Sequence, residues 1–188
     1  SQSKWMTRLA KIAKEKYNAS WVINNDADEF WLPQNGKSLK EILNFNGSVI
    51  TCHRYNVVLT SDCEHFFDSI YRVDSPIFYR KEIQEQSEKV SIVLAKNSPK
   101  VIVNPKGLIK VRGGNHKALH IRNIKDYFKA YDKIKRFKDI VVYHYPIRSY
   151  EQFEKNIINR KNLLESGTKV RMGPHYRRWV KIYNEGNL

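Results

Sequence analysis

Helical and strand-like spacings of apolar residues alternate along this chain, and this alternation constrains the fold more than any other feature of the sequence. Residues 4–17 have helical spacing, with Trp5, Leu9 and Ile12 along one side. The segment Trp21–Asn25 then has the composition of a short strand. The sequence therefore predicts an α/β fold in one domain over residues 1–188, with a mixed sheet flanked by helices.

Further helices and strands are predicted after this first pair. Ser38 and Glu41 have the spacing of a capping box, which opens a short helix through residue 43 or 44. Ser149 and Gln152 repeat that spacing before a helix that ends at Gly167. The other predicted helices cover 126–138 and 175–184. The other predicted strands cover 48–59, 76–81, 90–95, 101–103 and 140–145, with a hairpin over 108–121 that turns near Gly113 and Gly114.

The net charge and the cysteine content indicate which partners and which cellular location to expect. The formal net charge is +15, from 34 Lys and Arg against 19 Asp and Glu, which favours anionic partners such as nucleic acid, a lipid surface or a phosphorylated substrate. No apolar run approaches the roughly 20 residues that span a bilayer. Cys52 and Cys63 fit neither a metal site nor a disulfide framework. Reduced thiols favour a cytoplasmic location, and the charge is compatible with the inner face of the membrane.

Three carboxylates interrupt this basic chain directly after the strand predicted at Trp21–Asn25. Asp26 and Asp28 are two positions apart, roughly 6.6 Å on an extended chain, and face the same way. Two carboxylates in this arrangement can address one divalent cation, and Mg²⁺ or Mn²⁺ prefers such oxygen ligands. The alternative is a solvated loop in which the Asp side chains cap a turn.

Three segments together resemble a known family. The stretch "WVINNDADEFW", followed within two residues by Pro33, resembles the DxD segment of family 2-type glycosyltransferases with the GT-A fold, in the bacterial branch that reads D-x-D-E-F. The stretch "VVYHYPIRSYEQFEKNI", Val141–Ile157, resembles the downstream strand and helix of that branch, and "GGNHKA", Gly113–Ala118, resembles its Gly-Asn-His segment. The resemblance implies a partial GT-A, Rossmann-like fold.

The resemblance also implies an activity and a cofactor. A sugar would pass from a nucleotide-sugar, expected to be a UDP-sugar, to a glycan or other acceptor. Asp26 and Asp28 would hold Mn²⁺ or Mg²⁺ on the diphosphate, and the metal would stabilise the negative charge of the leaving nucleoside diphosphate. His144 is the candidate third ligand, because a downstream His often completes the metal site in GT-A enzymes; the alternative is a packed strand histidine.

The remaining candidate roles are less specific. Glu29 is the candidate catalytic carboxylate, to orient the acceptor or anchor the loop, and it is a candidate general base together with Asp62 and Glu64. His116 follows two glycines that let the backbone approach a ligand, so it would contact phosphate or acceptor, unless the segment is an ordinary hairpin turn. Arg148 would pair with the diphosphate. Lys155 is a weaker candidate for that role, because a solvated helix face explains it better.

The chain departs from the family pattern before the DxD segment. In the family the nucleotide-binding half precedes this segment, whereas only 25 residues precede Asp26 here. We therefore expect the chain to be the DxD-containing C-terminal portion of a longer enzyme; a degenerate enzyme and a second chain that supplies the rest are the alternatives. For the chain alone we expect weak or absent binding of nucleotide-sugar and no useful turnover.

Two other functions compete with this interpretation. Lys and Arg interleaved with Tyr, as in "HYRRWVKIY" and "DYFKAYDKIKRFKD", would suit a nucleic-acid-binding module without catalysis. Amphipathic helices with inward aromatic residues explain both stretches better, and we expect no nucleic-acid partner. A two-metal nuclease would need further carboxylates near the later strands, which offer few. Phosphate contacts to nucleic acid should weaken steeply with salt and ignore Mn²⁺.

Overall fold

The computed structural model describes residues 1–74, 91–94, 97–123, 136–167 and 172–187. The chain divides into two compact units, Ser1–Arg54 with Ser98–His144 and Tyr55–Asn97 with Tyr145–Leu188. The architecture is mixed α/β, with a curled mixed sheet and flanking helices, as the sequence predicts.

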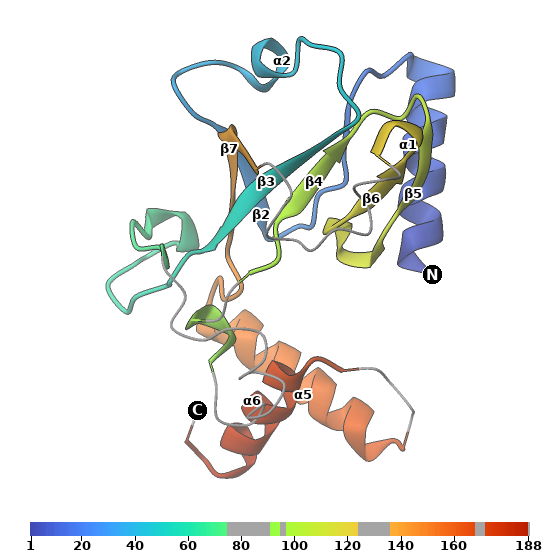
Figure 1. Ribbon diagram of the computed structural model, residues 1–188. Coiled ribbons are helices and arrows are strands. Elements are labelled where there is room, and N and C mark those ends of the chain that lie inside the picture. The colour runs from blue at the N-terminus through green and yellow to red at the C-terminus, as the bar shows by residue number, and fades with distance from the viewer. Residues whose placement is uncertain (75–90, 95–96, 124–135, 168–171, 188) are drawn as a thin grey trace. The chain divides into compact units, whose positions relative to one another are not determined.

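The first unit is built on a five-stranded sheet with the order β1-β4-β3-β7-β2 (Figure 1). The strands are β1 (Val22–Ile23), β2 (Glu29–Pro33), β3 (Val49–Asn56), β4 (Lys100–Val103) and β7 (Arg136–His144). The pairings β1–β4, β3–β4 and β2–β7 are antiparallel. A separate hairpin consists of β5 (Leu108–Val111) and β6 (Ala118–His120), and the helices are α1 (Gln2–Tyr17) and α2 (Leu39–Ile42).

Strand β4 lies in the core of this unit, and all four of its residues are buried. Val101 and Val103 pack in one cluster with Met6 and Ala10 of α1 and with buried residues of the hairpin. Ile102 points to the opposite face, as alternation along a strand requires, and packs with apolar residues of β3 and β7. Because β4 is covered on both faces, its sequence reads as a continuous apolar run after Lys100.

Local signals in the sequence locate several of these elements. The helix predicted over 4–17 is α1, and the hairpin predicted over 108–121 is β5–β6 with Gly114 at a φ of 74°. The capping box is present in both directions: the Glu41 amide donates to the Ser38 hydroxyl, and the Ser38 amide donates to the Glu41 carboxylate. Each of these signals involves residues that are only a few positions apart, so it does not depend on contacts between distant parts of the chain.

Two predictions are wrong within the described residues. The strand predicted over 90–95 is a 3₁₀ turn at Ile92–Leu94. The last residues of the helix predicted over 126–138 begin β7 instead, because that strand starts at Arg136. The rest of that helix and the strand predicted over 76–81 lie outside the described residues. Strand β2 was not predicted at all.

The second unit contains two helices that pack on each other, α5 (Tyr150–Glu165) and α6 (Pro174–Asn184). Ile157, Trp179 and Val180 form their buried centre. The Ser149 hydroxyl accepts a hydrogen bond from the Gln152 amide at the start of α5, and Gly167 has a φ of 70° just after its end. The predicted helices over this region are therefore confirmed. No helix among the described residues has both the length and the apolar character to cross a bilayer.

Candidate functional site

The acidic motif of the DxD segment, residues 26–29, lies in the first unit, on the connection from β1 to the start of β2. Strand β1 ends at Ile23, and the Glu29 amide donates to the Asp26 carbonyl at 3.1 Å, which closes a turn over the motif. Glu29 then starts β2, which pairs antiparallel with β7, so Glu29 is the register partner of His144. The pairing of β2 with β7 therefore brings the end of the DxD segment to the end of the strand that carries the predicted histidine ligand.

Asp28 and His144 meet at this junction. Asp28 Oδ2 lies 3.4 Å from His144 Nε2, and their side chains remain 35% and 19% exposed. A carboxylate oxygen and an imidazole nitrogen at this separation can face one small ligand together. Two positions that the sequence predicts as metal ligands, 116 residues apart in the chain, thus lie in contact.

Asp26, the third predicted metal ligand, has a different partner. Its Oδ2 lies 2.6 Å from the Nζ of Lys100, the first residue of β4. The same ammonium lies 2.9 Å from Glu29 Oε1, which also accepts from Arg54 Nη1 at 2.9 Å. Asp26, Lys100, Glu29 and Arg54 therefore form one chain of charges beside the Asp28–His144 pair.

This charge network is buried at its centre. The side chains of Lys100 and Glu29 are each 1% exposed, and that of Arg54 is 13% exposed. Buried ions are tolerated only when they are paired, so Lys100 and Arg54 compensate Glu29 and fix the start of β2. The geometry thus favours the anchoring role of Glu29 over the other roles predicted for it, because a base must reach an acceptor.

Asn115 connects the Gly-Asn-His segment to the motif. Its side-chain amide donates to the carbonyl of Asn24, just before the motif, and to that of Val101 in β4. Asn115 is 1% exposed and has a φ of 55°, a left-handed conformation that Asn tolerates better than most residues. The Gly-Asn-His segment of the hairpin therefore fixes the backbone just before the DxD motif through these hydrogen bonds.

His116 is held next to the charge network. Its Nδ1 lies 2.9 Å from the Pro99 carbonyl, one residue before Lys100. Burial lowers the pKa of His116 to about 4; the Pro99 carbonyl and Asp26 oppose this shift, whereas Lys100 and Arg54 add to it. The ring is therefore neutral at physiological pH, and its Nδ1 donates to Pro99. Contact with a phosphate would use a neutral hydrogen bond rather than a cation.

The lowered pKa of His116 predicts a pH-dependent stability. The unfolded chain protonates this ring near its ordinary pKa of 6.5 and the folded chain only near 4, so stability is complete above pH 6.5 and falls between 6.5 and 4. His116→Gln should reduce that loss by roughly 2–3 kcal/mol. Urea unfolding at neutral pH and at about pH 4 measures this, with exposed His65→Gln as the control. Equal acid sensitivity of wild type and His116→Gln would contradict it.

The other predicted site residues belong to the second unit. Arg148 is partly buried just before the cap of α5, and Lys155 is exposed on α5. Asp62 and Glu64 are exposed, and a hydrogen bond from Thr60 lowers the pKa of Asp62. Their roles stay predictions.

Sequence reasoning missed Lys100 and Arg54. The only signal for Lys100 is its place at the start of a buried apolar run, and a lysine there normally reaches solvent. Arg54 lies in an ordinary polar stretch of β3. Neither residue could be linked to the motif without the pairing of the strands.

The described residues, 1–74, 91–94, 97–123, 136–167 and 172–187, hold no group of three or more His, Cys, Asp or Glu side chains arranged to bind one metal ion. Asp28 and His144 form a pair, and Asp26 is directed to Lys100. Comparisons with protein families, with curated proteins and with solved structures found no match for this chain.

Proposed function

We propose that this chain is the metal-binding portion of a GT-A glycosyltransferase, which transfers a sugar from a nucleotide-sugar to a glycan or other acceptor. The observation that carries the proposal is the contact between Asp28 and His144, at 3.4 Å. The DxD segment and the stretch Val141–Ile157, which contains His144, lie far apart in the sequence, and the β2–β7 pairing brings Glu29 opposite His144. The mixed sheet, with the acidic motif after β1, is compatible with a partial Rossmann-like GT-A fold.

The donor set fits a divalent cation that is shared with a substrate. Ligands at right angles on Mg²⁺ or Mn²⁺ lie roughly 3 Å apart, close to the separation of Asp28 Oδ2 and His144 Nε2. Mg²⁺ is usually bound through one or two carboxylates while substrate phosphates complete its shell. Imidazole is a good ligand for Mn²⁺. Two protein ligands therefore suffice for a cation that binds together with a nucleoside diphosphate.

The buried charges beside this pair supply its rigidity. Lys100 holds Asp26 and Glu29 together, and Arg54 holds Glu29 from a neighbouring strand. Since Glu29 follows Asp28 directly, these ion pairs fix the backbone that positions the Asp28 carboxylate. The other carboxylate oxygen of Asp26 would serve the cation or its water. In this proposal Glu29 is a positioning residue rather than the general base.

In the proposed sugar transfer, negative charge develops on the departing nucleoside diphosphate. When bound, the cation would offset the negative charge of the departing nucleoside diphosphate. Asp28 and His144 would hold it, and neutral His116 would offer a hydrogen bond to a phosphate or to the acceptor. UDP is the proposed nucleotide.

Binding of UDP should therefore depend on a divalent cation. Saturation-transfer NMR, which detects weak binding, should show a UDP signal with Mg²⁺ and none with a chelator. Asp26→Ala and Asp28→Ala should lose the signal, whereas exposed Asp139→Ala, which removes an equal charge from the same unit, should keep it.

The same experiment separates the proposal from nucleic-acid binding. Binding through phosphate contacts alone should weaken steeply as salt rises and should persist in the chelator. A UDP signal that survives the chelator and Asp28→Ala would contradict a metal-mediated site.

A further inference from the structure

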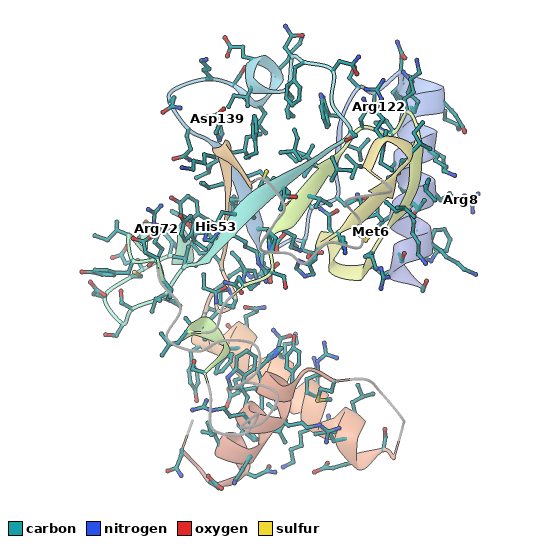
Figure 2. All side chains as sticks on the ribbon, viewed as in Figure 1. Met6, Arg8, His53, Arg72, Arg122 and Asp139 are labelled. Carbon is teal, nitrogen blue, oxygen red and sulfur yellow. The ribbon has the colours of Figure 1, made fainter. Side chains whose placement is uncertain are left out.

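The solvent-facing side of α1 forms a basic surface. Figure 2 shows Arg8 directed away from the strands and Met6 directed toward them, so the two faces of α1 have different environments. An open groove follows α1 and β5. Its lining includes five cations, Lys4, Arg8, Lys11, Lys16 and Lys110, and one carboxylate, Glu15. Within the described part of the chain none of the five cations forms an ion pair.

Large apolar side chains lie beside these cations. Trp5 is 61% exposed and Leu9 is 57% exposed, and their i, i+4 spacing places them on one face of α1. Ile109 of β5 is 40% exposed and lines the groove. The Arg8 guanidinium lies 5.9 Å from the centre of the Trp5 ring. Trp5 thus lies beside Arg8 on α1, and Ile109 lies with Lys110 in the lining of the groove.

We propose that this α1–β5 surface, defined by Lys4, Trp5, Arg8, Leu9, Lys11 and Lys110, binds the interface of an anionic phospholipid bilayer. The Lys and Arg side chains would lie at the anionic headgroups, and the negative charge of the headgroups would attract each of them. Trp5 and Leu9 would enter the boundary between headgroups and acyl chains, where amphipathic helices bury such residues. This proposal is independent of the sugar-transfer chemistry, because none of its residues belongs to the acidic site.

The apolar residues favour a lipid over nucleic acid as the occupant. Nucleic-acid surfaces combine cations with aromatic rings that stack on bases. Leu9 and Ile109 have neither a ring to stack nor a group to donate a hydrogen bond, so their exposure gains nothing from a nucleic acid. At a bilayer interface these two side chains would be removed from water, and the favourable free energy of that transfer is roughly proportional to their apolar area.

Vesicle sedimentation of the full chain tests the proposal. Vesicles of phosphatidylcholine with phosphatidylglycerol should bind the protein, and pure phosphatidylcholine should bind it far less. Each cation removed should lower the partition coefficient about fivefold, so Lys4→Gln with Lys11→Gln should lower it about 25-fold. Lys37→Gln with Lys40→Gln removes two exposed cations elsewhere in the same unit and is the matched control.

The apolar contribution needs its own variants. Trp5→Ala with Leu9→Ala should lower the partition coefficient at least tenfold and should leave thermal unfolding unchanged, because both side chains are exposed. Brominated lipid should quench part of the tryptophan fluorescence, and Trp5→Phe should remove that quenching while it preserves binding. Both results would support insertion of this face.

Other outcomes would overturn the proposal. One is equal loss of vesicle binding from the control pair and the Lys4–Lys11 pair, which would indicate general charge attraction. Another is unchanged vesicle binding in the Trp5–Leu9 variant. A third is no vesicle binding while single-stranded or duplex DNA binds and is lost with Lys4→Gln and Lys11→Gln, which would assign the surface to nucleic acid.

Discussion

Lys100→Met should lower the free energy of unfolding by about 3 kcal/mol at neutral pH. The methionine keeps most of the volume of the stem but removes the ammonium that Asp26 and Glu29 share. The Glu29 side chain is buried, and among the described residues its carboxylate would retain Arg54 as its remaining ion-pair partner. Removal of one member of a buried ion pair is costly because the other charge stays desolvated. Urea unfolding followed by tryptophan fluorescence measures the change.

A double-mutant cycle separates the ion pair from general loss of packing. Glu29→Gln alone should also destabilise the chain, and Lys100→Met combined with Glu29→Gln should cost less than the sum of the two. Lys110→Met replaces an exposed strand lysine and should change stability by no more than about 0.5 kcal/mol. If Lys100→Met is as mild as Lys110→Met, the buried network does not stabilise the motif as described.

The second large effect is expected at His144. His144→Ala should weaken binding of Mn²⁺, in the presence of UDP, by at least about a hundredfold. Loss of a residue that only supports a ligand costs 10–100-fold, and His144 would contact the cation itself. Titration calorimetry with Mn²⁺ and UDP measures the affinity, and His65→Ala, which removes an exposed histidine, is the control.

A modest effect would assign His144 another role. The ring would then be a packed strand residue that neighbours Asp28 without sharing a ligand with it. A loss of Mn²⁺ affinity below about threefold in His144→Ala, with the helix content and unfolding temperature of wild type, would contradict its place in the metal site.

Local signals explain which parts of the fold could be predicted from the sequence. Helix α1 and the capping box at Ser38 depend on residues three or four apart, and both are present. Strand β2 was missed because Glu29–Pro33 begins with a charged residue and ends in proline; only its antiparallel partner β7 defines it as a strand. A proline is tolerated there because, among the described strands, β2 lies at one edge of the sheet.

In the candidate site, too, some residues could be predicted from the sequence, whereas their contacts could not. Asp26 and Asp28 were candidates because of their spacing after a strand-like run, and His144 because the resemblance implies a downstream His, but which of them meet is decided by strand register. The register places His144 opposite Glu29 and so beside Asp28, while β4 directs Lys100 to Asp26. A lysine at the start of a strand normally reaches water, so its burial against two carboxylates has no signature in the local sequence.

The most direct test of the proposed metal site is electron paramagnetic resonance of Mn²⁺ with UDP and the chain, because free Mn²⁺ gives a sharp signal that binding removes. Wild type and Asp139→Asn should deplete the signal of free Mn²⁺ to the same extent. With Asp28→Asn the signal should equal that of a sample of Mn²⁺ and UDP that contains no protein. The two variants change one carboxylate to an amide in the same unit, so only the position differs. Equal depletion by Asp28→Asn and by wild type would contradict a metal site at Asp28 and His144.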